Sequence, residues 1–173
     1  DAVVHALTTV STGGFSNSDI SFAKFDSNME LVAIVFMLLA SMPFIRFVQA
    51  TQGSFRPLWQ DPQVRAYLRW NCYGIAAVVI YEMVHLDRPF WETLRESSFN
   101  IVSTFSGTGF ASVDLSTWGP FPFVVLIAVG LIGGCTSSTG CSVKVFRYLI
   151  LLEAIKVQIR RLRSPSGVID VRY

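Results

Sequence analysis

Two short segments of the sequence carry serine, threonine, glycine and phenylalanine in a similar order, at residues 9–16 and 104–111. Rings of backbone carbonyl oxygens replace the hydration shell of potassium in selectivity filters, and glycine permits the conformations that aim those carbonyls inward. A cation path of this kind needs no nucleophile and no covalent step. The residues that we expect to line it are Ser11, Thr12, Gly13, Gly14, Ser106, Gly107, Thr108 and Gly109.

The two segments belong to an internal repeat. Sliding the sequence by 95 residues places residues 9–16 on residues 104–111 and Asp19 on Asp114, and five of these nine pairs are identical. The same slide superposes the apolar runs that follow the two segments. A single stretch rich in Ser, Thr and Gly is by default an ordinary turn between helices. Two such stretches in register, each between a half-span and a full span, favour equivalent strands of one filter.

The residues that follow the glycines complete each segment. Phe15 and Phe110 are expected to support the filter from behind, where an aromatic ring can pack against the preceding helix. Asp19 and Asp114 lie just outside the segments, and their charges are expected to raise the local concentration of cations.

A third polar stretch, at residues 133–142, interrupts an apolar span halfway across. Backbone groups freed at membrane depth must find protein or water partners, so we expect this stretch to face the conduction path below the filter as a movable barrier. A helix kink with packing of small residues is the alternative. The residues assigned to this gate loop are Gly133, Gly134, Cys135, Thr136, Ser137, Ser138, Thr139 and Gly140.

The composition indicates a membrane protein. Hydrophobic residues make up 51% of the 173 residues and charged residues only 15%, and the mean hydropathy is positive, which does not fit an ordinary soluble domain. Candidate crossings cover residues 31–48, 67–86 and 121–134, with an apolar continuation at 143–152. No signal peptide is visible, and the sequence begins inside a motif, which we interpret as an excerpt of a longer protein.

The repeat predicts the elements that position the filter segments. Residues 89–104 suit a half-membrane helix with proline in its first turn, and residues 1–9 would be the matching pore helix of the first unit. The predicted fold is an all-α integral membrane protein of outer helix, pore helix, filter loop and inner helix. It divides into a partial repeat at 1–49, a cytoplasmic linker at 50–65, a complete repeat at 66–163 and the start of a further linker at 164–173.

Charged residues predict the orientation and leave some roles open. Lys and Arg favour the cytoplasmic side, so the basic linker and the basic end of the last span face inward and the acidic loops outward. Lys144 and Arg147 are expected either to pair with a carboxylate or to extend to the cytoplasmic interface. Glu82 is more readily explained by an arginine partner or a structural hydrogen bond than by proton coupling.

The cysteines and histidines do not indicate a metal site or an enzyme. Cys72, Cys135 and Cys141 lack the spacing of a zinc site or a disulfide framework, and we interpret them as buried thiols. Either of the last two would have to reach His85, near the opposite face, to form a nucleophile and base pair. We therefore predict no enzymatic activity.

The sequence resembles the Trk/Ktr/HKT superfamily of potassium transporters, and within it the TrkH-type membrane subunits. The resemblance rests on TTVSTGGFS at residues 8–16, STFSGTGFAS at 103–112 and GGCTSSTGCSVKVFR at 133–147, and it covers nearly the whole chain. In this family four repeats surround one pore and each contributes one filter strand. The resemblance therefore implies a potassium-channel-like fold with about one and a half of the four repeats. Cys141 and Ser142 replace residues that are usually glycine.

The resemblance also implies a function and partners. It implies potassium uptake across the cell inner membrane through a filter gated by the intramembrane loop, with potassium as the transported ion and no cofactor. The implied partners are a second copy in a homodimer, membrane lipid and a cytoplasmic ring of nucleotide-binding regulatory subunits of the TrkA type, but no nucleic acid. The alternative is a secondary transporter that binds a solute or sodium at its broken helices.

Overall fold

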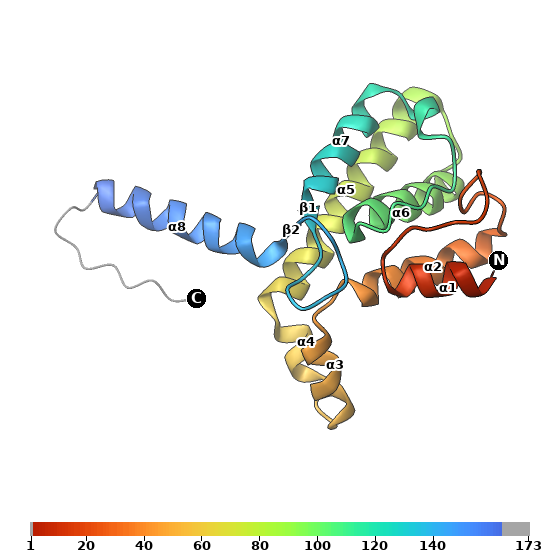
Figure 1. The fold of residues 1–173 in the computed structure, drawn as a ribbon. Helices are drawn as coiled ribbons and strands as arrows, with labels where there is room; N and C mark the ends of the chain where they lie inside the picture. The colour runs from red at the N-terminus through yellow and green to blue at the C-terminus, as the bar shows by residue number, and fades with distance from the viewer. Residues whose placement is uncertain (1, 164–173) are drawn as a thin grey trace.

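The computed structural model describes residues 2–163, which form a helical body from which the last helix extends (Figure 1). The linker predicted at 164–173 lies outside the described residues. The first half contains α1 (Ala2–Val10), α2 (Ser27–Ala40), α3 (Phe44–Thr51) and α4 (Arg56–Gln60). The second half contains α5 (Pro62–Leu86), α6 (Phe90–Ser106), the short 3-10 helix η1 (Leu115–Trp118), α7 (Pro120–Leu131), β1 (Ile132–Gly133), β2 (Val143–Lys144) and α8 (Val145–Arg163).

Helices α5 and α6 pack against each other and are joined by a short turn, and their ends are set by local sequence. The Asp61 carboxylate accepts the Gln63 N–H at 2.8 Å and Pro62 occupies the first turn, two features that start α5. Asp87 takes a left-handed φ of 46° and ends α5, and Pro89 precedes α6. Helix α5 covers the crossing predicted at residues 67–86, and α6 covers the half-membrane helix predicted at residues 89–104.

The apolar run at residues 31–48 is not one continuous helix, contrary to our expectation. Helix α2 ends at Ala40, α3 begins at Phe44, and the two helices are bent by 94°. Pro43 explains the break, because it lacks an N–H and disfavours helical conformation at Met42. By length and hydropathy, the bent pair together meets the requirement for a membrane crossing, and no single helix within residues 2–163 does.

Helix α6 lies at the centre of the body and is buried between the two halves. Helices α5 and α7 pack on one side of it and α2 packs on the other. A helix that is covered on several faces buries side chains around most of its circumference, and α6 buries both polar and apolar ones. The apolar ones that α6 contributes to the two core clusters are Phe99, Ile101, Val102 and Phe105.

The outward faces of α2, α5 and α7 carry large apolar side chains that the body leaves uncovered. Val35 is 53% exposed, Ile80 63% and Val124 62%. Three helices that each expose apolar residues form a surface that requires a lipid or protein environment.

The three cysteines are free thiols. Cys135 is buried, but Cys72 and Cys141 are exposed, so the prediction of buried thiols is wrong for these two. Cys72 lies on α5, and Cys141 lies in the loop between β1 and β2, where the chain is not covered on all sides.

Candidate functional site

The two predicted filter segments lie at equivalent ends of two helices, because one follows the last residue of α1 and the other follows the last residue of α6. The backbone takes positive φ at Thr12 (51°) and Gly14 (67°), and again at Gly107 (78°) and Gly109 (81°). The two residues of each equivalent pair are 95 positions apart. The backbone pattern therefore repeats with the period found in the sequence.

Each segment is tied to its own helix by the same set of hydrogen bonds. In the first unit, Gly13 N donates to Thr8 O at 2.9 Å, and the Thr8 hydroxyl donates to Phe15 O at 3.0 Å. The same pattern occurs in the second unit, so it follows from the repeated sequence. The equivalent bonds of the second unit are Thr108 N to Ser103 O (3.0 Å) and Ser103 Oγ to Phe110 O (2.7 Å).

The two segments approach each other at Gly14. A Cβ atom on Gly14 would lie 1.8 Å from the carbonyl oxygen of Thr108, a distance that no side chain can occupy. Gly109, in contrast, would have no atom within 4 Å of an added Cβ. Gly14 is therefore required by both close packing and conformation, whereas Gly109 is required by its conformation.

The carbonyl oxygens of the two segments divide into a bonded and an unbonded group. Ser11 O accepts the Thr12 hydroxyl at 2.8 Å, and Ser106 O accepts the Cys141 N–H at 3.3 Å. The phenylalanine carbonyls at the other end accept the helix hydroxyls described above. Within residues 2–163, no hydrogen-bond donor contacts the carbonyl oxygens in the middle of either segment, at Thr12, Gly13, Gly14, Gly107, Thr108 and Gly109.

The two phenylalanines differ in their surroundings. Phe110 is buried, and its ring centroid lies 5.3 Å from that of Phe22 and 5.6 Å from that of His5. Phe15 is 74% exposed, so the packing that we expected for it behind the filter is not found in the described part of the chain. The reason is physical: the loop after α1 supplies Phe22 to cover Phe110, and no described loop covers Phe15.

An open cavity of about 410 Å³ lies beyond the two segments and is lined by Asp19 and Asp114. Both aspartates are exposed. The Asp114 carboxylate accepts the Ser116 N–H at 3.0 Å, and hydrogen bonding to Ser116 lowers the pKa of Asp114 below its ordinary value. The two carboxylates that the sequence placed outside the segments thus share one cavity.

The gate loop closes on itself where β1 and β2 pair in parallel, Ile132 beside Val143 and Gly133 beside Lys144. A Cβ atom on Gly133 would lie 1.7 Å from Cys141 O, so only glycine fits there. The polar stretch is therefore a closed loop between two helices and not the kinked helix that was the alternative.

The gate loop fills the break between α2 and α3 (Figure 1). A broken helix leaves carbonyls without partners at the end of its first half and N–H groups without partners at the start of its second half. Here three such groups bond to the loop. The bonds are Cys135 N to Ser41 O (2.9 Å), Thr139 N to Ala40 O (3.3 Å) and Phe44 N to Ser137 O (3.0 Å).

The same loop also contacts the two predicted filter segments at the ends nearest to α1 and α6. Cys141 N donates to Ser106 O at 3.3 Å, and the Thr139 hydroxyl donates to Val10 O at 3.3 Å. A Cβ atom on Gly107 would lie 2.8 Å from the Cys141 Cβ. The loop is thus in direct contact with both segments at the ends where their helices stop.

Lys144 stabilises the loop from within. Its ammonium group donates to the carbonyl oxygens of Gly140 and, at 3.4 Å, of Ser138. The sequence left a carboxylate partner or the cytoplasmic interface as alternatives, but the amine binds backbone carbonyls of the gate loop instead. Arg147, one turn further along α8, is exposed.

An ion network of buried carboxylates and partly exposed arginines connects the two halves of the chain. Arg95 of α6 pairs with Glu30 of α2 and lies 3.5 Å from Glu96. Arg88 lies 2.9 Å from Glu96 and 3.8 Å from Glu82 of α5. The arginine partner expected for Glu82 is therefore present, and the network joins α5, α6 and α2.

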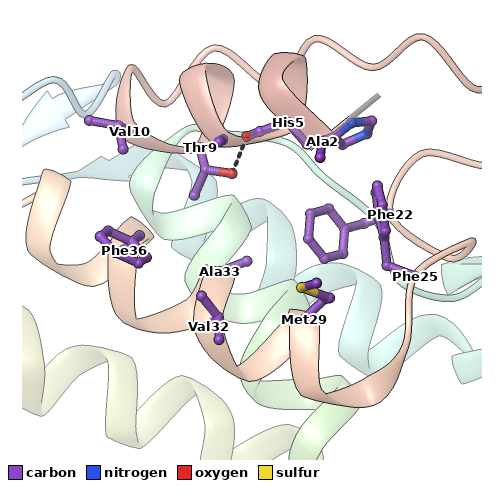
Figure 2. Close-up of a pocket in the computed structure, with 11 residues that line it drawn as sticks. Ala2, His5, Thr9, Val10, Phe22, Phe25, Met29, Val32, Ala33 and Phe36 are labelled. Atoms are coloured by element: carbon purple, nitrogen blue, oxygen red, sulfur yellow. Dashed lines mark hydrogen bonds between the residues drawn. The ribbon is translucent and has the colours of Figure 1, made fainter.

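A second cavity lies between α1 and α2 and has a volume of about 320 Å³ (Figure 2). Its lining is apolar apart from His5 and Thr9, and the Thr9 hydroxyl donates to His5 O at 2.5 Å. Such a lining suits a hydrocarbon group and gives no ligands for a cation. This cavity reaches the first segment only at Thr9 and Val10 and includes none of the residues predicted to line the filter.

Comparison with known proteins places the chain in a family. A family model described as TrkH, cation transport protein, matches residues 1–172. The chain belongs to the TrkH family. It is 37% identical to the Trk system potassium uptake protein TrkI of Halomonas elongata over 100% of the chain and 35% of that protein, and 28% identical to TrkH of Escherichia coli over 99% of the chain and 36% of that protein.

A solved TrkH-family structure shares the fold. The crystal structure of the potassium transporter TrkH from Vibrio parahaemolyticus matches with a TM-score of 0.92 and 28% sequence identity, over 99% of this chain and 38% of that one. The chain thus spans between a third and two fifths of the length of the relatives it matches. The mostly helical architecture expected from the sequence is confirmed by this match.

The sequence reasoning missed several residues that hold the segments in place. Thr8, Ser103 and His5 bond to the segments and Asn100 bonds just beyond the second one, but all four lie ahead of residues 9–16 and 104–111, the stretches that define the repeat. Extending the 95-residue slide by four positions would have paired His5 with Asn100 and Thr8 with Ser103, two pairs of polar residues facing the same way along equivalent helices.

Proposed function

We infer that the segments around Gly14 and Gly109 are two strands of a potassium-selective path and that the loop at residues 133–140 gates it. The observation that carries the proposal is the set of six unbonded carbonyl oxygens on two strands with one backbone pattern. Alternation of positive and negative φ along a strand turns successive carbonyls to one side, where they can replace the water around potassium.

The bonded carbonyls narrow the proposed lining. Ser11 and Ser106 carry carbonyls that already accept hydrogen bonds, so we limit the lining to the three middle residues of each strand. Helices α1 and α6 end at these strands, and the negative ends of their dipoles favour a cation there. The carboxylates of Asp19 and Asp114 in the outer cavity attract cations toward it.

Gating follows from where the loop lies. The loop touches the inner ends of both strands and is held by the α2–α3 break and by Lys144. Its bonds to the break are backbone hydrogen bonds of ordinary length, which can be broken and remade one by one. We propose that displacement of this loop opens the path on its inner side.

The family and the surface support the location and partners of the intact protein. The relatives are named potassium uptake proteins of the Trk system. The exposed apolar faces of α2, α5 and α7 suit a bilayer, and Arg160, Arg161 and Arg163 end α8 on the proposed cytoplasmic side. We propose an inner-membrane homodimer with a cytoplasmic nucleotide-binding ring of the TrkA type.

The test of the filter is the ratio of rubidium to sodium influx in proteoliposomes that contain the intact transporter. Replacing Gly109 with serine alters a left-handed position without a steric clash, so the protein should fold and lose selectivity. An unchanged ratio would show that the strand does not select ions. Uptake of an organic solute in place of rubidium would favour a secondary transporter.

A further inference from the structure

Two buried polar side chains occupy equivalent places behind the two strands. His5 of α1 and Asn100 of α6 are 95 residues apart and are 4% and 1% exposed. His5 Nε2 lies 3.1 Å from the hydroxyl of Ser16, and Asn100 Nδ2 donates to the hydroxyl of Ser112 at 3.0 Å. Each contact joins a helix to the chain just beyond its proposed filter strand, with Ser16 one residue and Ser112 two residues after the phenylalanine.

One arrangement of protons gives the hydrogen bonds the same direction in both units. The Ser16 hydroxyl lies 3.1 Å from Ser18 O and 3.1 Å from His5 Nε2, and when it donates to Ser18 O it accepts from the His5 tautomer with a proton on Nε2. Asn100 Nδ2 is a donor by its chemistry. In this arrangement a different side chain in each unit presents an N–H to a serine hydroxyl.

The backbone carbonyl of each residue accepts a hydrogen bond from a threonine hydroxyl one turn further along its helix. The Thr9 hydroxyl donates to His5 O, and the Thr104 hydroxyl donates to Asn100 O at 2.8 Å. Asn100 makes one further contact to its strand, because Ser112 N lies 3.4 Å from Asn100 Oδ1. His5 makes a different one, since its ring stacks 5.6 Å from that of Phe110 in the other unit.

We propose that His5 and Asn100 are positioning residues that fix the outer end of each strand through Ser16 and Ser112. The inference rests on the proposed filter and adds to it the groups that set the spacing of its carbonyls. Each strand is then held at two points. A hydroxyl of the preceding helix donates to the phenylalanine carbonyl, and the N–H of His5 or Asn100 donates to the hydroxyl of the serine beyond it. Neither residue contacts the ion.

The experiment measures the ratio of rubidium to sodium influx for His5→Leu, Ser16→Ala and the double variant of the intact transporter. Loss of one hydrogen bond predicts a ratio about three- to tenfold lower in each single variant. Because both single variants remove the same bond, the double variant should be no worse than the poorer single one. His5→Gln keeps an N–H donor at similar reach and should stay within about twofold of the wild type.

Asn100→Leu, Ser112→Ala and their double variant form the matched cycle in the second unit, with the same expectation. Additive losses in either cycle, or singles that leave the ratio unchanged, would overturn the proposal. Gly109→Ser separates the two levels. If it lowers the ratio while both cycles fail, the filter stands and the positioning role is wrong, and if it changes nothing, the filter and this inference fall together.

Discussion

The two helix breaks of this chain occupy equivalent places in the repeat and are built differently. Between α2 and α3 the chain needs only Ser41, Met42 and Pro43 to turn by 94°. Between α7 and α8 it runs through the whole loop at residues 132–144, closed by two short strands. The short break leaves backbone groups without helical partners, and the long loop supplies those partners. The short break therefore anchors the long loop, which is the segment that we propose to move in gating.

The two proposed filter strands, in contrast, share one backbone structure. Positive φ recurs at equivalent positions of the two strands. In both units a hydroxyl of the preceding helix, from Thr8 or Ser103, donates a hydrogen bond to the phenylalanine carbonyl. A strand that must present carbonyls to an ion tolerates little change in its backbone, whereas a helix beyond the filter can be cut in several ways. The contrast between the two units thus separates the proposed selective part of the path from its proposed gate.

The largest expected effect comes from uncoupling the two units. Arg95→Met leaves Glu30 as an unpaired buried charge, so we expect a loss of about 3–5 kcal/mol in the free energy of unfolding. Thermal unfolding of the intact transporter in detergent measures it. Adding Glu30→Gln removes the stranded charge and should recover part of the loss.

An exposed ion pair on α8 provides the control for this variant. Lys156 and Glu153 lie 2.7 Å apart with side chains 58% and 49% exposed, and breaking such a pair changes stability little. If Arg95→Met proved as mild as Lys156→Gln, the ion network would not couple the two units.

The next effect separates the loop from the helix that precedes it. Gly133→Ala drives a Cβ to within 1.7 Å of Cys141 O, so the loop cannot close and rubidium should leak through the unregulated path. Gly130→Ala, in the last turn of α7, meets only the end of the Thr104 side chain at 3.3 Å and serves as the control. Equal rubidium fluxes through the two variants would show that the loop does not act as the gate.

Lys144→Met should loosen the loop less severely. The substitution removes a charged donor from the carbonyls of Ser138 and Gly140, and such hydrogen bonds contribute about 1.5–3 kcal/mol each. We expect a higher resting rubidium flux with an unchanged rubidium to sodium ratio, because the strands are untouched. A changed ratio would mean that Lys144 acts on the filter itself.

The smallest effect is at the outer cavity. Asp114→Asn should reduce rubidium influx by less than about twofold, and only at low ionic strength, because exposed charges act weakly and are screened by salt. The pKa of Asp114 is lowered, so its charge persists as pH falls from neutral to its ordinary pKa, and is lost only below that. A step in rubidium influx between pH 5 and 8 that disappeared in Asp114→Asn would contradict the assignment, because it would place the titration of this carboxylate in that range.

The sequence was sufficient for the repeat and for most helix positions. The 95-residue slide found the equivalent strands because their conformation depends on local glycines and hydroxyls, which a sequence displays directly. The break at Pro43 could also have been predicted, since proline disrupts helical structure at its own position. We predicted a single crossing there because the residues on both sides of Pro43 are apolar. Long apolar stretches favour one helix only where no proline interrupts them.

The partners of the loop could not be read from the sequence. The bonds of Cys135 and Ser137 to the α2–α3 break join residues about a hundred positions apart, and no pattern of residue types signals them. The amine of Lys144 bonds to carbonyls, which every residue has. The supporting role expected for Phe15 stays a prediction, because no described segment covers its ring.

The most direct test is to locate the ion in the intact transporter. Anomalous diffraction from crystals grown with rubidium measures where the cation sits relative to the strands. The account predicts a peak between the carbonyls of Gly13 and Gly14 on one side and those of Thr108 and Gly109 on the other. A transporter that conducts rubidium but shows its peaks only away from these four carbonyls would contradict it.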